Sequence, residues 1–168
     1  MKRTFIAIFL ILFAVTIQAQ EKSITSEVST YYFIRHAEKV KIESSDPELS
    51  AEGKLRAVRW AEIFENISFE TIYSTDYIRT RNTALPTAQS KGLELILYHP
   101  GKIDYEKFLS ETKGKTVLVV GHSNTTPAFV NKLIGTEKYK LIDHDKYGNL
   151  YIVEITEGTV TNKLLYIN

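Results

Sequence analysis

The segment YYFIRHAE, at residues 31–38, decides the fold that we expect for this chain. Its first four residues are apolar or aromatic and lead directly into Arg35 and His36. A short apolar run without polar alternation is typical of a strand that is buried on both faces of a parallel sheet. The polar pair then marks the carboxyl end of that strand, which is the edge where ligands bind in open α/β sheets. The segment therefore predicts a central strand with a functional end.

A second segment, TVLVVGH at residues 116–122, repeats this arrangement. Its apolar run is the strongest in the chain and ends at Gly121 and His122. The carboxyl ends of parallel strands meet at one edge of a sheet, so His36 and His122 can converge although they are far apart in the sequence. Two histidines at neighbouring strand ends indicate phosphoryl chemistry.

An arginine follows a third strand-like stretch, at residues 69–73. This residue, Arg79, stands four positions before the pair Thr83-Ala84. With Arg35 it supplies two guanidinium groups, whose planar donors suit bidentate recognition of phosphate. The site expected at this edge thus combines two imidazoles with two guanidinium groups.

The three motifs together resemble the histidine phosphatase superfamily, whose branches include the phosphoglycerate mutases and the short phosphohistidine phosphatases. The family's Arg-His-Gly/Ala-Glu signature falls on residues 35–38. Its second arginine falls on Arg79, and its second histidine, after a strand and a glycine, falls on His122. The resemblance covers nearly everything after the first residues of the chain.

This resemblance implies a role for each motif residue. His36 is the expected nucleophile, which attacks phosphorus as a neutral imidazole and forms a phosphohistidine. Arg35 and Arg79 are expected to bind the phosphate oxygens, and His122 is expected to add a further donor as a second catalytic residue. The implied function is a metal-independent phosphatase acting on a phosphomonoester. A mutase-like phosphotransferase and a non-catalytic protein that binds a phosphate ligand remain as alternatives.

The chain departs from the family at one phosphate ligand. Mutase-like members carry an asparagine six residues after the nucleophilic histidine, where this sequence has Ile42. The ligand is therefore missing or replaced, and Ser44 and Ser45 are the nearby candidates.

The general acid is also unplaced. Asp104 and Glu106 follow the third predicted strand at a plausible distance, His99 is another candidate, and Ser123 stands where phytase-like members have an aspartate. Short phosphohistidine phosphatases manage without a strong acid, because a phosphoramidate leaving group needs less help. The acid, or its absence, therefore decides the substrate class, which the sequence leaves open.

Residues 1–19 read as a signal peptide. Lys2 and Arg3 precede an apolar run at residues 5–15, and Ala19 ends a plausible cleavage site. The run is shorter than the ~20 residues that span a bilayer, so we expect cleavage and no stable membrane anchor afterwards. The predicted location is periplasmic or secreted. Residues 20–30 are then an exposed lead-in to a domain at residues 31–168.

The amino-acid composition restricts the kinds of partner that we expect the protein to bind. Removal of Lys2 and Arg3 from the 21 basic residues leaves 19 against 20 acidic ones, and no basic run with interleaved aromatics indicates nucleic-acid binding. The four histidines, including His144 in a polar and presumed exposed loop, show no metal-ligand spacing, and arginines beside two of them would repel a dication. We therefore expect no metal and no cofactor, and a small-molecule or surface-presented phosphate as the partner.

Alternating strand-like and helical segments favour an α/β domain. The expected architecture is a three-layer sandwich, with a mostly parallel central sheet flanked by helices and a C-terminal edge hairpin formed by residues 150–155 and 160–167. Ser50 is expected to cap a helix whose apolar face includes Leu55 and Val58. A second helix, at residues 78–90, is expected to be kinked or interrupted by Pro86.

Overall fold

The computed structural model describes residues 27–167. The predicted signal peptide at residues 1–19, and the expected lead-in up to residue 26, lie outside the described residues. In chain order the elements are β1 (Val28–Arg35), α1 (Ala51–Ile63), β2 (Thr71–Thr75), α2 (Ile78–Lys91), β3 (Leu95–Tyr98), α3 (Tyr105–Glu111), β4 (Thr116–Gly121), α4 (Thr125–Ile134), β5 (Asn149–Thr156) and β6 (Thr159–Tyr166). None of the helices in this described range is long and apolar enough to cross a membrane.

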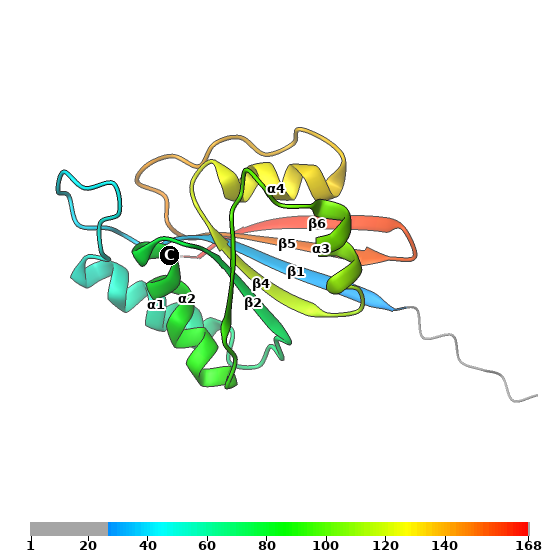
Figure 1. Ribbon diagram of the computed structural model, residues 1–168, viewed down its shortest axis with the longest axis horizontal. Coiled ribbons are helices and arrows are strands. Elements are labelled where there is room, and N and C mark those ends of the chain that lie inside the picture. The colour runs from blue at the N-terminus through cyan, green and yellow to red at the C-terminus, as the bar shows by residue number, and fades with distance from the viewer. Residues whose placement is uncertain (1–26, 168) are drawn as a thin grey trace, which may run out of the picture.

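The six strands form one sheet in the order β3-β2-β4-β1-β5-β6. The strands from β3 to β1 run parallel, whereas β5 and β6 form an antiparallel hairpin at one edge. Helices α1 and α2 cover one face of the sheet and α3 and α4 cover the other (Figure 1). The predicted three-layer α/β fold, with a mostly parallel sheet and a C-terminal hairpin, is confirmed.

The central strands are buried on both faces because successive side chains point in opposite directions. Tyr31 and Phe33 of β1 join a core cluster with Phe129 of α4. Ile34 points the other way, into a second cluster that contains Trp60 of α1. With both layers anchored to it, β1 holds the Arg35-His36 end in a fixed place.

Strand β1 begins earlier than expected. Val28 pairs with Thr156 and Thr30 with Glu154, both in the antiparallel ladder with β5. The hairpin supplies backbone partners for residues 28–30, so the first strand begins at Val28 and not at Tyr31.

The buried face of α1 also differs from the predicted one. Leu55 is 70% exposed and Val58 is 49% exposed, while Gly53 and Ala57 are buried. A Cβ at Gly53 would lie 2.0 Å from the carbonyl oxygen of Glu38. Gly53 therefore allows α1 to approach the segment that follows His36, and this contact sets the helix rotation together with the burial of Trp60.

Pro86 does not interrupt α2, which runs continuously from Ile78 to Lys91. Proline removes one hydrogen bond from a helix interior. Burial of Thr83, Ala84 and Ala88 on the sheet outweighs that loss.

Candidate active site

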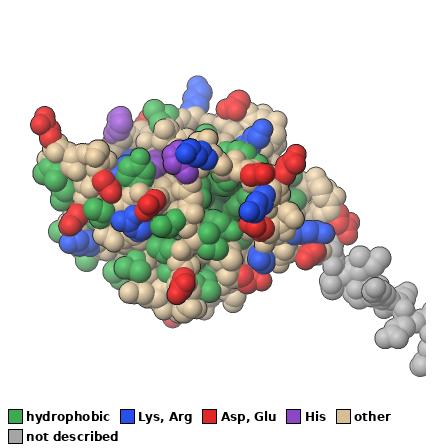
Figure 2. Space-filling view, viewed as in Figure 1, with side chains coloured by type: hydrophobic (Ala, Val, Ile, Leu, Met, Phe, Trp, Pro, Cys, Tyr) green, Lys and Arg blue, Asp and Glu red, His purple; other side chains and the backbone are tan. Residues whose placement is uncertain are grey.

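The carboxyl ends of the parallel strands open into a cavity of about 780 Å³. All four histidines of the chain line it, together with Arg35, Lys39 and Arg79, and the amino end of α4 lies at its wall with Asn124 and Thr125. Histidine side chains lie beside lysine and arginine side chains on the face shown in Figure 2. The four predicted site residues, Arg35, His36, Arg79 and His122, are thus brought together.

His36 is held by the peptide group that follows it. Its side chain is at the end of β1 and the residue is only 4% exposed. Its Nδ1 lies 2.8 Å from the carbonyl oxygen of Ala37. A carbonyl can only accept, so Nδ1 carries the hydrogen of the neutral ring and Nε2 keeps its lone pair. The ring therefore presents Nε2 as its nucleophilic atom.

The Ala37 peptide group is itself fixed. Its N–H donates to Thr83 Oγ1 at 2.9 Å, and that hydroxyl donates to the carbonyl of Arg79 at 2.7 Å. The Thr-Ala pair that follows Arg79 in the sequence thus ties α2 to the end of β1. Glu38 completes the signature by pairing with Arg56 Nε at 2.8 Å, which places it in support of the loop and not in the cavity.

The electrostatic surroundings keep His36 neutral. Burial lowers its pKa to about 3, the bond to Ala37 opposes that shift, and the nearby Arg35, His122 and Arg79 lower the pKa further. A buried imidazole beside two guanidinium groups loses its proton readily, because both low polarity and like charge disfavour the imidazolium. The nucleophilic form is therefore the dominant one at neutral pH.

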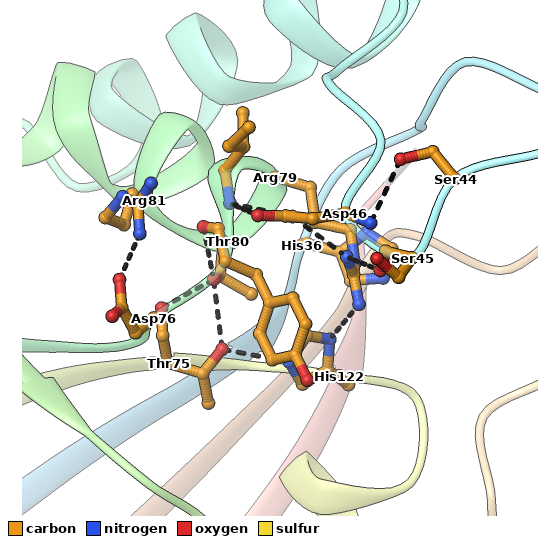
Figure 3. A network of polar contacts seen from close by, with 12 residues as sticks. His36, Ser44, Ser45, Asp46, Thr75, Asp76, Arg79, Thr80, Arg81 and His122 are labelled. Atoms are coloured by element: carbon orange, nitrogen blue, oxygen red, sulfur yellow. Dashed lines mark hydrogen bonds and ion pairs between the residues drawn. The ribbon is translucent and has the colours of Figure 1, made fainter. Parts of the chain in front are cut away.

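His122 is held from the opposite side of its ring. Its Nε2 lies 2.9 Å from Thr75 Oγ1 at the end of β2. Behind Thr75, its Oγ1 and that of Thr80 lie 3.0 Å apart, and Thr80 Oγ1 donates to the carbonyl of Thr75 at 2.7 Å (Figure 3). Both threonines are fully buried. The other nitrogen, Nδ1, lies 3.5 Å from the Arg79 Nη2 atom.

Burial also lowers the pKa of His122, to about 4, with Arg79 and Arg35 acting in the same direction and Asp46 against them. The rings of His36 and His122 are 5.5 Å apart between centroids. Both histidines are therefore neutral neighbours at physiological pH.

Arg79 reaches the cavity from the first turn of α2. Its Nη1 pairs with Asp46 Oδ1 at 3.2 Å, and its guanidinium lies 4.4 Å from the ring centre of Tyr77. The Asp46 carboxylate also accepts the backbone N–H of Ile78, at 2.9 and 3.1 Å. Asp46 thus anchors the loop after β1 to the start of α2, and it orients Arg79.

Arg35 is buried and serves a loop as well as the cavity. Its Nη1 donates to the carbonyls of Asp143 at 2.9 Å and Lys146 at 2.8 Å. Its guanidinium lies 4.2 Å from the ring centre of Tyr147. Its Nε is buried without a hydrogen-bond partner. An orphaned buried donor on a cavity-lining arginine is the feature that a bound anion would satisfy.

The proposed replacements for the missing phosphate ligand do not line the cavity. Ser44 Oγ accepts the N–H of Asp46 at 3.2 Å, and the carbonyl of Ser45 accepts from Arg79 at 3.4 Å. Lys39 lines the cavity instead. The serines therefore shape the loop that carries Asp46, and Lys39 is the cation that reaches the cavity from it.

The candidates for the general acid differ in whether they line the cavity. Asp104 Oδ1 caps α3 by accepting from the N–H of Lys107 at 3.0 Å, and Glu106 stands in the first turn of that helix. Neither is among the residues that line the cavity, so both are helix-start carboxylates. His99 does line it, with Nδ1 accepting from the N–H of Gly101 at 3.1 Å. His144 is exposed, as expected, but stands at the rim of the cavity.

Sequence reasoning missed several residues of this site, namely Lys39, Asp46, Thr75, Thr80 and Tyr147. Thr75 stands at the end of β2, so its strand-end position was the available signal. Among residues 27–167 there is no group of three or more His, Cys, Asp or Glu residues that could hold a metal ion.

Comparison with known proteins gives a match to one family model. The sequence model described as the histidine phosphatase superfamily (branch 1) matches residues 31–99. No curated protein matches the sequence significantly.

Several solved structures share the fold. The alpha-ribazole phosphatase from Shigella flexneri is 13% identical, with a TM-score of 0.63 over 82% of this chain and 96% of that one. A mycobacterial glucosyl-3-phosphoglycerate phosphatase is 12% identical, with a TM-score of 0.63 over 83% and 98% of the two chains. A provisionally assigned phosphohistidine phosphatase from Agrobacterium tumefaciens is 17% identical, with a TM-score of 0.59 over 83% and 99%. The match over residues 31–99 and the shared fold together confirm the resemblance to the histidine phosphatase superfamily.

Proposed function

We propose that this protein is an exported, metal-independent phosphatase that hydrolyses a phosphomonoester through a phosphohistidine on His36. The observation that carries the proposal is the state of the His36 ring, which is neutral, fixed through Nδ1 and free at Nε2 beside two arginines. The family match and the phosphatases among the structural neighbours support a phosphoric monoester hydrolase.

The reaction divides into two displacements at phosphorus. In the first, His36 Nε2 forms a bond to phosphorus while the bond to the alcohol oxygen breaks. In the second, water attacks the phosphohistidine and releases inorganic phosphate and the neutral imidazole. Arg79, Arg35 and the amino end of α4 neutralise the charge on the phosphoryl oxygens. Positioning and electrostatics are the main contributions that a protein makes to phosphoryl transfer.

The surroundings of the leaving group favour activated substrates. Asp76 is the one carboxylate among the cavity-lining residues of the described chain, and it forms an ion pair with Arg81 (Figure 3). No carboxylic acid is therefore placed to protonate a departing alkoxide. Aryl phosphates and phosphoramidates leave with less assistance, so we infer a preference for such leaving groups, with His99 as the remaining donor.

The charge of the cavity supports metal independence. Arg35, Lys39 and Arg79 line it and would oppose a divalent cation. We expect hydrolysis to persist in excess chelator. Complete loss of activity that zinc or magnesium restores would contradict this part of the proposal.

The deciding experiment is to trap the covalent intermediate. The mature protein is mixed with a labelled phosphate donor and quenched in alkali, and the modified residue is identified by mass spectrometry. We expect acid-labile label on His36, no label in the His36→Ala variant and unchanged label in His144→Ala. Phosphate binding without label or turnover would support the binding-protein alternative, and transfer of the label to a second alcohol would support the phosphotransferase.

Export rests on the sequence of residues 1–19. A cleaved chain would begin near Gln20 and meet small or surface-presented phosphates in the periplasm or outside the cell. N-terminal sequencing of protein recovered from the native envelope tests this. An intact chain that starts at Met1 in the cytoplasm would contradict it.

A further inference from the structure

Thr75 and Thr80 form a buried hydroxyl chain that the proposed reaction does not use. The chain runs from His122 Nε2 through the hydroxyls of Thr75 and Thr80 to the carbonyl of Thr75. It ends at backbone carbonyls, because Thr80 Oγ1 also lies 3.0 Å from the carbonyl oxygen of Tyr77. A chain of this kind has a direction, which is set by its last acceptor.

Counting hydrogens fixes that direction. Each hydroxyl has one hydrogen, and a carbonyl has none, so the Thr80 hydrogen is directed at carbonyl oxygen. The hydroxyl of Thr80 can then only accept from Thr75, and the hydroxyl of Thr75 can only accept from His122. The hydrogen of the neutral His122 ring is therefore on Nε2.

Arg79 leads to the same tautomer from the other side of the ring. Guanidinium nitrogens donate and do not accept. The Nη2 atom lies 3.5 Å from His122 Nδ1, so this nitrogen faces the arginine with its lone pair. Two independent neighbours thus agree on one tautomer.

This tautomer has a consequence for an anion in the cavity. Nδ1 is the ring nitrogen that is not held by buried threonines, and its lone pair would repel a phosphate oxygen. We infer that Thr75 and Thr80 are positioning residues that keep the proton of neutral His122 on Nε2, so that a tetrahedral dianion binds together with one proton taken up at Nδ1. The inference rests on the proposed phosphate site, and it adds that binding is coupled to protonation.

The charges around His122 support this coupling. Arg79 from α2 and Arg35 from β1 disfavour the imidazolium, and Asp46 from the loop after β1 favours it. His36, directly after β1, and the Tyr77 ring are its neutral neighbours. Burial and the two arginines keep the pKa of His122 at about 4 in the free protein. A dianion reverses the local field and raises that pKa. The proton comes from solvent and returns there when the anion dissociates, so affinity falls as pH rises, by a factor approaching ~10 per pH unit for full uptake of one proton.

Sulfate is the probe that isolates the protein's own proton, because sulfate stays a dianion near neutral pH. Calorimetric titration at pH 7 in buffers of different ionisation enthalpy counts the protons taken up per sulfate. We expect a value approaching one for the unmodified protein and for Thr75→Ser, which keeps the hydroxyl. The Thr75→Val variant should take up less, because Arg79 at 3.5 Å is then the one remaining neighbour that favours the Nε2 tautomer, and Nδ1 can carry the hydrogen of the neutral ring when sulfate binds. Thr87→Val is the matched control, since Thr87 is a buried threonine of α2 whose hydroxyl has no partner, and its uptake should not change.

A second measurement needs no turnover, and its first part needs no sulfate. Nitrogen NMR of the labelled histidines reports which ring nitrogen of His122 is protonated. We expect hydrogen on Nε2 alone in the free protein and on both nitrogens with sulfate. Hydrogen on Nδ1 of the free ring, sulfate binding without proton uptake, uptake that persists in His122→Asn, or failure of millimolar sulfate to bind would each overturn the inference. Proton uptake in a protein without phosphatase activity would contradict the proposed function only.

Discussion

His36 and His122 end neighbouring parallel strands, yet they are held through opposite ring nitrogens. His36 is fixed at Nδ1 by the next carbonyl in its own chain segment, which leaves Nε2 free. His122 is fixed at Nε2 by Thr75 of another strand, and its Nδ1 faces Arg79. The strand ends provide proximity, and a single hydrogen-bond partner decides which atom of each ring is available. The same side chain can therefore serve as a nucleophile in one place and as a partner for phosphate oxygen in the other.

The two arginines, like the two histidines, are held by different partners. Arg35 is bound to the backbone of the loop at residues 143–146, whereas Arg79 is bound to the carboxylate of Asp46. Each arginine therefore joins one histidine to a different loop. Substitution of Arg35 should therefore affect binding and catalysis differently from substitution of Arg79.

The largest effect is expected when the nucleophile is removed. The His36→Ala variant should lose at least ~10³-fold in kcat, because no covalent intermediate can form. The His122→Ala variant should lose less, about 10²- to 10³-fold, since it removes one stabilising donor. Steady-state rates with an aryl phosphate, with folding checked by circular dichroism, give both values. Equal losses in the two variants would contradict the division of roles between the rings.

The leaving group gives the next largest effect. Because Asp76, the one carboxylate among the described residues that line the cavity, is paired with Arg81, aryl phosphates and phosphoramidates should be cleaved ~10²- to 10⁴-fold faster than alkyl phosphates, which is the usual rate contribution of a general acid. Asp104→Asn and Glu106→Gln should leave this ratio unchanged, because neither residue lines the cavity. Rates with the two substrate classes in all three proteins test the expectation. Selective slowing of alkyl ester hydrolysis in either variant would identify that residue as the general acid. If the rate depends only weakly on leaving-group acidity in all three proteins, with chemistry rate-limiting, His99 becomes the candidate acid.

Replacing each arginine by lysine separates the two halves of the site. Arg79→Lys should weaken phosphate binding by about tenfold, because a lysine cannot make bidentate contacts. Arg35→Lys should do the same and in addition loosen residues 143–146, whose carbonyls it holds. Hydrogen exchange of that loop, measured beside the inhibition constant for phosphate, distinguishes them. Equal exchange in both variants would show that Arg35 does not hold the loop.

The sequence was informative where structure is local. The apolar runs before Arg35 and Gly121 predicted two central strands and placed His36 and His122 at one edge. The partner of His36 is the next carbonyl, so nothing distant was needed to orient that ring. Thr75 contacts His122 only after β2 and β4 pair, so its position at a strand end was a signal for the site but did not identify its partner.

The expected apolar face of α1 was wrong at Leu55 and Val58, because apolar character was weighed above size and position. The buried face contains Gly53, Ala57 and Trp60, and the small size of Gly53 permits close approach to Glu38. Asp104 and Glu106 stood at a plausible distance along the chain, but their place at the start of α3 was explained by capping alone. Distance in sequence after a strand does not establish that a side chain reaches its end.

The smallest expected effect concerns stability and pH, and it compares the two rings once more. Their folded-state pKa values, about 3 for His36 and about 4 for His122, lie below the ordinary value of 6.5. The unfolded chain therefore binds more protons than the folded one, and stability falls as pH drops below 6.5. The decrease in the free energy of unfolding ends at about pH 4 for His122 and at about pH 3 for His36. Each ring contributes at most about 1.4 kcal/mol per pH unit. Urea unfolding at several pH values between 6.5 and about 4 should show a shallower decline in the free energy of unfolding for both His36→Gln and His122→Gln than for the unmodified protein. A decline as steep in His36→Gln as in the unmodified protein would mean that burial does not keep this ring neutral.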